Sequence, residues 1–272
     1  MTFTVDLVDL RHALAAVVPH ASNAKTVPVL RNVRLTPFGV NLEVSATDRH
    51  TVALALVSIL EGDDDGDVID LTPEEVQQVL TVFPPPGKGE EGTLEVAVTD
   101  TKVIITDVAG LIAGKALTLT RRTHETFPEL RRLFAGRLQP SDEPTGEVWF
   151  HATTLKRFAA AQRAYEYPLV FHRVPAPGRS WVVRCGDSFV ALVSPVRQDE
   201  DAQLEANRWR DDWDVRLGPA DGDPAEVWDW LVQGAATYSG TAPADDDVDD
   251  QPDDGEQPAP RVTLHVPEWG PR

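Results

Sequence analysis

The chain opens two of its predicted helices with the same short pattern, and this repeat narrows the possible folds more than any other feature. The sequence TPEEVQQVL occupies residues 72–80, and DPAEVWDWL occupies residues 223–231. Each copy starts with a side-chain oxygen that can cap the first turn, continues with a proline whose missing N–H costs nothing there, and carries a glutamate that completes a capping box. A duplicated helix start predicts a duplicated structural plan.

Other landmarks return at a constant spacing. EVSATDRHTVALALV at 43–57 is echoed by VVRCGDSFVALVSPV at 182–196, and FPEL at 127–130 is echoed by VPEW at 266–269, both at an offset of 139 residues. The sequence therefore predicts two tandem domains, residues 1–135 and 136–272, each of ordinary domain size.

Within each half, apolar alternation predicts strands and a 3.6-residue period predicts helices, with one helix for every three or four strands. The third such group is predicted to begin with a strand at 147–151 and a helix at about 153–165, and the fourth with a strand at 213–217. One helix can cover only one face of the sheet that it accompanies. The sequence thus predicts an α+β fold of tandem β-α-β-β-β units with the helices on one face of antiparallel sheets.

The net charge is −19, and the charges are distributed unevenly along the chain. This excludes nucleic-acid binding over the whole surface but not local contact through basic segments. Residues 121–197 carry 12 basic and 7 acidic side chains, whereas residues 198–272 carry 5 basic and 20 acidic ones. The stretch 240–260 has no aromatic residue and too few apolar ones to offset the entropy of ordering, so we expect a disordered acidic loop. Because RVTLHV at 261–266 resumes strand alternation, the loop is expected inside a second domain whose second half is degenerate.

The remaining composition indicates a cytoplasmic protein. The N-terminus lacks the basic and apolar regions of a secretory signal, and no stretch has the roughly 18–20 apolar residues of a membrane span. The lone cysteine, Cys185, excludes an internal disulfide and lies in an apolar context typical of a buried, inert thiol.

The sequence contains no recognisable catalytic, cofactor or metal constellation, so we expect a protein that is not an enzyme. PPPGKGEEG lacks the spacing and the hydroxyl of a phosphate-binding loop. EGDDDGDVIDLT at 61–72 ends on Thr72, where a calcium loop needs a bidentate glutamate. The histidines lack ligand spacing, and His12 and His20 are expected at the surface.

Several stretches together resemble the bacterial DNA polymerase III beta subunit, the sliding clamp of chromosomal replication. They are LRHALAAVVPHASNAKTVPVLRNVRL, LEVSATDRHTVALAL, VIDLTPEEVQQVL, FPEL and EVWFHATTLKRFAAAQRA, and they cover residues 1 to about 197. The resemblance implies the DNA-clamp fold, with helices lining a ring around duplex DNA and sheets outside. It also implies a DNA polymerase and a clamp loader as partners, with no cofactor and no membrane contact.

The expected assembly follows from the domain count. Bacterial members of the family have three domains and pair into a six-domain ring, so a two-domain chain is expected to close a ring of three copies, head to tail. A second hypothesis is a phage- or plasmid-encoded, clamp-like protein that does not close a ring and binds or competes for replisome partners.

The resemblance implies basic side chains that hold phosphates without reading bases. On the helix at 153–165, Lys156 and Arg163 share a face with Arg157 beside them, a pattern that is also typical of a solvated charged face. The predicted DNA-binding residues are Arg11, Lys25, Lys156, Arg157, Arg163 and Arg173. Against DNA contact, the second and fourth helices carry acidic side chains where the family tends to place basic ones: Glu74, Glu75, Glu226 and Asp229.

The family forms its partner-peptide pocket partly from a Thr-Asp-Gly-His-Arg-Leu stretch in the second domain. Here the second domain reads CGDSFVAL, and the closer wording lies in the first domain. The predicted partner-peptide pocket therefore comprises Thr47, Arg49, His50 and Val52. Two tryptophan-rich stretches have less definite roles: NRWRDDWDVRLG at 207–218 is predicted as linker and strand, and one of Trp228 and Trp230 as a partner anchor.

Overall fold

The computed structural model describes residues 1–62, 67–87, 89, 91–110, 112, 114–124, 126–139, 147–174, 180–197 and 199–217. The chain divides into two compact units, Met1–Ala202 and Gln203–Arg272. The predicted domain boundary at 135/136 stays a prediction. The acidic loop at 240–260, the strand at 261–266, the second capping box and its tryptophans lie outside the described residues.

The first β-α-β-β-β group occupies the N-terminal 62 residues. Asp6 caps its helix by accepting hydrogen bonds from Val8 N (2.7 Å) and Asp9 N (2.9 Å). Two short 3-10 helices, Val18–His20 and Pro28–Arg31, connect the helix to the next strand. The elements of this group are β1 (Thr2–Asp6), α1 (Leu7–Val17), β2 (Val33–Phe38), β3 (Asn41–Thr47) and β4 (Thr51–Gly62).

The second group repeats the order, as the sequence predicts. Its helix α2 starts with the predicted capping box, in which Glu75 N donates to Thr72 Oγ1 (3.2 Å) and Thr72 N donates to Glu75 Oε2 (2.9 Å). The elements are β5 (Ile69–Leu71), α2 (Pro73–Val82), β6 (Thr93–Val98), β7 (Lys102–Asp107) and β8 (Ala116–Thr120).

The third group contains α3 (Ala152–Tyr165), β9 (Leu169–Arg173), β10 (Trp181–Cys185) and β11 (Phe189–Val193). The predicted strand at 147–151 is wrong. The segment lies beside the end of β11, where Val196 N donates to Trp149 O (2.7 Å), and it leads into α3 without a strand ladder. Its apolar alternation misled because Phe150 packs on the core from a non-strand backbone.

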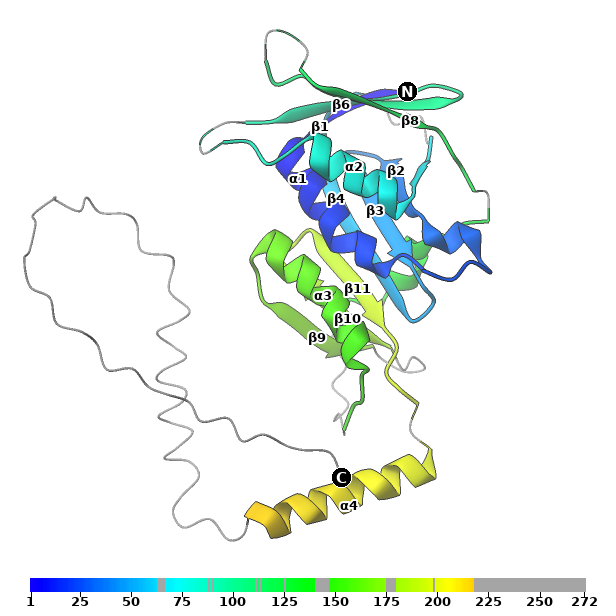
Figure 1. Cartoon of the computed structure of the whole chain (residues 1–272), viewed down its shortest axis with the longest axis vertical. Helices are drawn as coiled ribbons and strands as arrows, with labels where there is room; N and C mark the ends of the chain where they lie inside the picture. The colour runs from blue at the N-terminus through cyan, green and yellow to red at the C-terminus, as the bar shows by residue number, and fades with distance from the viewer. Residues whose placement is uncertain are drawn as a thin grey trace, which may run out of the picture. The chain divides into compact units, whose positions relative to one another are not determined.

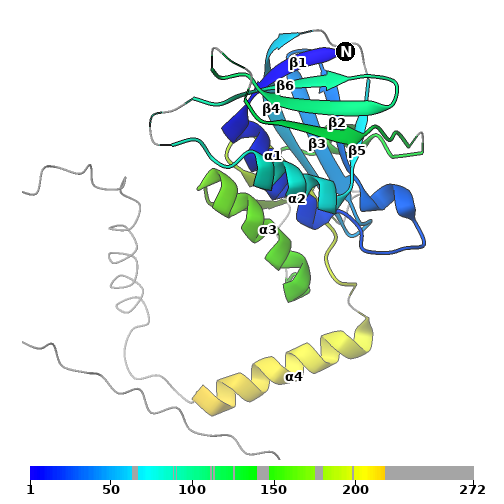
Figure 2. The ribbon, with the colours of Figure 1, turned by 45° about the horizontal axis from the view of Figure 1, so that its top comes forward.

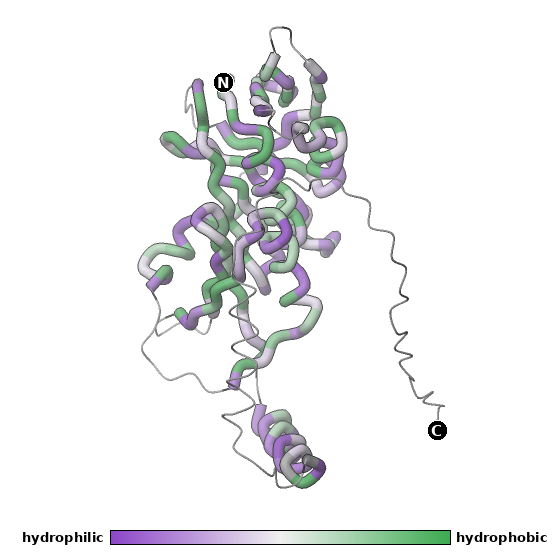
Figure 3. The backbone as a smooth tube through the Cα atoms, turned by 90° about the vertical axis from the view of Figure 1, so that its left-hand side faces the viewer, coloured by the Kyte–Doolittle hydropathy of each residue, from purple (hydrophilic) through white to green (hydrophobic). Residues whose placement is uncertain are grey.

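The predicted linker and strand at 207–218 are also wrong, because Glu200–Leu217 form one helix, α4. Asp199 caps the start of α4 by accepting a hydrogen bond from Ala202 N (2.8 Å). The carboxylates of Glu200 and Asp201 in the first turn interact favourably with the positive end of the helix dipole. The apparent alternation of Trp213 and Val215 was too short to outweigh these start signals. Hydrophilic and hydrophobic residues follow one another along α4 (Figure 3).

Among the described residues of the unit Met1–Ala202, all strand pairs are antiparallel and form one network, ordered β5-β2-β3-β4-β1-β6-β7-β8. The third group joins this network through the long strand β4. One end of β4 pairs with β1. At the other end, Val52–Ala55 pairs with β3 on one side, and Thr51–Ala55 pairs with β11 on the other side. The register sets Val52 opposite Leu192, so the sheet runs continuously from the first group into the third.

Helices α1, α2 and α3 lie on the same side of the strands (Figures 1 and 2), and α1 contacts both of the others. The main core lies between them and the strands, and its largest fully buried side chains include Phe3, Leu10, Leu14, Leu42 and Phe158. This arrangement confirms the predicted α+β plan of repeated β-α-β-β-β units. Among the described residues, no helix is long and apolar enough to cross a membrane.

Cys185 belongs to this core, as expected. Its side chain is fully buried, and its thiol donates to Tyr167 O (3.2 Å). Burial raises the pKa of the Cys185 thiol, so the reactive thiolate form is disfavoured.

Candidate nucleic-acid interface

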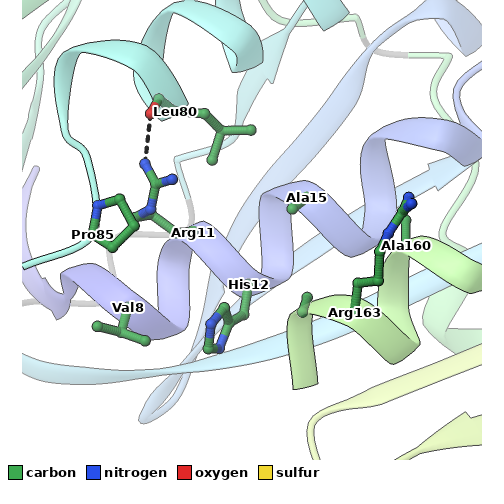
Figure 4. A pocket seen from close by; sticks show the side chains of 9 residues that line it. Val8, Arg11, His12, Ala15, Leu80, Pro85, Ala160 and Arg163 are labelled. Carbon is green, nitrogen blue, oxygen red and sulfur yellow. Dashed lines mark hydrogen bonds between the residues drawn. The ribbon is translucent and has the colours of Figure 1, made fainter. Parts of the chain in front are cut away.

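Helices α1, α2 and α3 enclose a groove of about 340 Å³ on their side of the molecule. We call it the three-helix groove; its lining residues are Val8, Arg11, His12, Ala15, Leu80, Pro85, Ala160, Arg163 and Ala164. Figure 4 shows α1 running between the residues of α2 and those of α3. Two guanidinium groups, one imidazole and otherwise apolar side chains line the groove, with no carboxylate among them. Such a lining suits a negatively charged ligand.

Arg11 joins two of these helices. Its Nη1 donates to Leu80 O (2.6 Å) and to Phe83 O, the carbonyls left without helical partners where α2 ends (Figure 4 shows the first bond). Burial lowers the pKa of Arg11, but the group stays protonated at physiological pH. Arg11 therefore has a structural role that the sequence did not reveal, and its contact with DNA stays a prediction.

Arg157 connects α3 to the turn between β3 and β4. Its Nη1 donates to Asp48 Oδ2 and to Thr51 Oγ1 (3.0 Å). Burial raises the pKa of Asp48, but hydrogen bonds from Thr51 and Arg157 and the charge of Arg157 outweigh this, so the pKa lies below its usual value. Because Asp48 neutralises the charge of Arg157, Arg157 is a weaker candidate for a phosphate contact than Lys156 and Arg163 on the same helix.

Lys156 and Arg163 are exposed on α3, and Lys25 is exposed in the loop between the two 3-10 helices. In the described part of the chain, no ion pair involves any of these three side chains. Arg173 lies elsewhere, at the end of strand β9 and opposite Trp181 of β10. The structure thus brings Arg11 and Arg163 into one groove and leaves Arg173 on a strand.

One of the two acidic residues of α2 is withdrawn from a ligand, and the other is exposed. Glu75 is buried: it caps its own helix and pairs with Arg122 Nη1 (2.6 Å). Glu74 is exposed, and Gln77 and Gln78 beside it carry no charge. The exposed face of α2 is therefore close to neutral rather than strongly repulsive. Glu226 and Asp229 lie outside the described residues.

The predicted peptide-pocket residues form the tight turn between β3 and β4. Thr47 is buried, and its hydroxyl donates to Thr51 O (2.7 Å) and accepts from Arg49 N (3.1 Å). Arg49 has a φ of 79°, and both Arg49 and His50 are exposed. Val52 is half-buried against a small apolar cluster that includes Phe134. The structure brings the four residues together, while the docking of a partner there stays a prediction.

One histidine expected at the surface is in the core. His20 is fully buried, with its ring 5.0 Å from the Phe158 ring and 6.2 Å from the Phe189 ring between centroids. In the described part of the chain neither ring nitrogen has a hydrogen-bond partner, and burial, helped by the charge of Arg157, lowers the pKa to about 3. Pro19 ends the first helix in a short turn that places His20 under α3, which helical periodicity could not show. His12 is half-buried in the groove.

The segment after β8 was also missed as a structural element. Arg34 forms a bidentate ion pair with Asp70 (both distances 2.8 Å), and His124 N donates to the same carboxylate (2.7 Å). The Arg34 guanidinium lies 4.4 Å from the centre of the Phe127 ring, so FPEL attaches to the sheet rather than acting as a free linker. Among the described residues, no group of three or more His, Cys, Asp or Glu side chains is arranged to hold a metal ion.

Repeated β-α-β-β-β groups with helices α1, α2 and α3 on one side of a continuous antiparallel sheet are the arrangement of the DNA-clamp class of fold. Comparison with solved structures identifies the bacterial version: the described chain has the fold of DNA polymerase III beta subunits, as its sequence resemblance predicted. The beta subunit from Thermotoga maritima is 14% identical with a TM-score of 0.54, and the sliding clamp from Bacillus subtilis is 14% identical with a TM-score of 0.55. The beta chain from Streptococcus pneumoniae is 15% identical with a TM-score of 0.53.

These three comparisons cover 73% of this chain, which spans 65% of the length of each clamp. No protein-family model matches the sequence, and no curated protein matches it.

Proposed function

We propose that the protein is a DNA sliding clamp: a non-enzymatic processivity factor that encircles duplex DNA and tethers a replicative polymerase. The observation that carries the proposal is the pair of exposed cations on α3, Lys156 and Arg163, on the helical side of a clamp-type sheet. Exposed cations on this face that form no ion pair within the described residues would supply what a sliding contact needs, attraction to phosphates without base recognition.

The proposed ring consists of three copies joined head to tail, loaded by a clamp loader and working in the cytoplasm. Two-domain chains reach six domains in this way, and a heterologous interface closes when the rotation between copies completes a circle. Lys25, which is exposed on a loop, is the third proposed phosphate contact.

The direct test is duplex binding by the full chain carrying Lys156→Gln and Arg163→Gln. Each lost phosphate contact makes the negative slope of log K against log salt shallower by about 1. The slope for the double variant should therefore be shallower by about 2, and by the same amount on any DNA sequence. The matched control is Lys102→Gln with Arg184→Gln, which removes the same charge from exposed positions on β7 and β10. An equal loss in both variants would reduce the effect to net charge and contradict the proposed interface.

A second candidate is a clamp-like protein that does not encircle DNA but binds or competes for replisome partners. It is favoured by the internal bonds of Arg11 and Arg157, which leave fewer free cations on the helical side, and by the exposed Glu74. Retention after loading separates the candidates. A closed ring stays on circular duplex DNA and leaves linear duplex from its ends, whereas a non-encircling protein leaves both at the same rate.

A further inference from the structure

Strand β9 has one edge without a partner strand in the described part of the chain. The other edge pairs with β10, and Val174 N donates to Ser180 O (3.1 Å) at the end of this ladder. Because backbone groups alternate along a strand, Val170 also turns its N–H and C=O toward β10. The N–H and C=O groups of Leu169 and Phe171 therefore point away from the sheet.

The side chains at this edge are apolar and accessible. Val170 is 45% exposed, Phe171 36% and the preceding Tyr167 60%. Exposed strand edges normally carry a charge, a proline or a bulge that blocks pairing with another strand. The stretch Leu169–Phe171 has none of these, because Pro168 lies just before the strand and the charged residue, Arg173, is at its far end.

The corresponding strand of the first group is protected. β2 follows α1 as β9 follows α3, and its outer edge is covered by β5, with Val33 opposite Leu71. In the described part of the chain the edge of β8 is open too, but two of the three residues that direct their backbone groups outward there, Thr118 and Thr120, are polar and exposed. β9 is thus the open edge best suited to bind another apolar strand.

We infer that β9 pairs with β9 of a second copy of this chain, antiparallel, about a two-fold axis at Val170. In this register the two Val170 side chains meet, and Leu169 of each copy lies opposite Phe171 of the other. Those two residues direct their backbone groups outward, so they exchange hydrogen bonds across the axis. Within Leu169–Phe171 every contact joins apolar to apolar. Beyond it, Arg173 of one copy lies opposite Tyr167 of the other, so no like charges face each other in this register.

Continuity of the sheet also favours a second β9 over β8 as the partner. Arg121 N donates to Thr101 O (2.9 Å), so Thr118 directs its backbone groups outward from β8 while its side chain is exposed. On β9, Phe171 also directs its backbone groups outward, but its side chain lies on the core face of the sheet. The Phe171 ring is 6.2 Å from the Phe158 ring between centroids. An antiparallel β8–β9 pair would set a polar face beside a core face, whereas a β9–β9 pair keeps both core faces on one side. It extends the sheet as the β4–β11 pair already does.

The inference does not depend on DNA binding or on ring closure. Joined through β9, two open chains form a dimer and two three-membered rings form a hexamer, so the number of copies is even in either case. A single strand pair is a small interface, so association is expected in the micromolar range, on the order of 10 µM.

The test exploits the symmetry of the axis. Val170→Glu keeps a partner within its own chain, because Val170 lies opposite Arg184 of β10, but it brings two carboxylates together at the axis. The mass in solution, measured by light scattering across a concentration series, is expected to fall by half. Val170→Lys is expected to do the same, and an equimolar mixture of the two variants should restore the original mass. Far-UV circular dichroism verifies that both variants keep their fold.

The matched control is Thr118→Glu on the other open edge, which should leave the mass unchanged. At concentrations well above about 10 µM, a single copy or an odd number of copies in the unaltered chain, or a variant mixture that stays at half mass, overturns the inference. Hydrogen exchange distinguishes the remaining alternative: the Leu169 and Phe171 amides should become protected as concentration rises. Protection that persists at every dilution would show that the chain itself covers the edge, and that result also overturns the inference.

Discussion

The first and third groups share one plan, a helix above three antiparallel strands, but differ in how the strand after the helix is completed. In the first group, β2 is covered by β5 and held by the Arg34–Asp70 ion pair. In the third group, β9 has an open apolar edge in the described part of the chain. Among the described residues, a repeated sequence plan is thus accompanied by different sets of strand partners. The covering strand comes from a neighbouring group and has to be supplied separately.

The largest expected effect comes from breaking the cover of β2. Asp70 is fully buried, so Asp70→Ala leaves the Arg34 guanidinium without its partner and should lower the free energy of unfolding by about 3–5 kcal/mol. Urea unfolding measures the loss, and amides at the outer edge of β2 should exchange faster, as at an open edge. The double variant Asp70→Ala with Arg34→Met, which also removes the stranded charge, should recover part of the stability. No recovery would mean that the ion pair is not the element that holds β5.

A smaller effect is expected at His20, which lies where α3 meets the first group. Its pKa is about 3 in the folded chain against the ordinary 6.5, so the unfolded chain binds a proton first as pH falls. His20 therefore supports folding above pH 6.5, and this contribution declines toward pH 3. When the pH falls from 7 to 5, protonation of His20 in the unfolded chain should lower the free energy of unfolding by about 2 kcal/mol.

The variant that checks this expectation is His20→Leu, which fills a similar volume without a titratable ring. Urea unfolding of the variant at both pH values should show a pH dependence smaller by that amount. An identical pH dependence in both proteins would contradict the buried, neutral state of His20.

The smallest effect is expected at the helix start that first revealed the repeat. Thr72→Ala removes the side-chain cap of α2 and should lower the free energy of unfolding by about 1 kcal/mol. Thr72→Ser retains the hydroxyl and serves as the control, with a loss of a few tenths of a kcal/mol at most. Equal losses in the two variants would show that the methyl group, and not the cap, stabilises this end of α2.

Local signals predicted the elements well where they agreed with one another. A capping threonine, a proline and a helical period together predicted a helix that starts directly after Thr72, and the structure shows α2 at Pro73–Val82. Where apolar alternation stood alone, at 147–151 and 213–217, it was wrong, because a non-strand segment and a helix produced the same pattern over so few residues.

The candidate site was less predictable, because its side chains find partners far along the chain. Arg11 bonds to a carbonyl 69 residues away, and Arg157 to a carboxylate 109 residues away. Sequence spacing shows which face of a helix carries a charge, but not which tertiary neighbour neutralises it. The helical period placed Lys156 and Arg163 on one face, and both are exposed in the fold, but it was the family resemblance that indicated DNA contacts, which stay a prediction.

The shared strand β4 has a consequence for unfolding. Its residues take part in the ladders of β3, β1 and β11 at once, so opening this strand disrupts the first and third groups together. Repetition in the sequence therefore does not make these two groups independent, and they should melt in a single cooperative transition. A chain ended at residue 135 would lack β11 and expose the edge of β4 from Thr51 to Ala55, and such a fragment should be prone to aggregation.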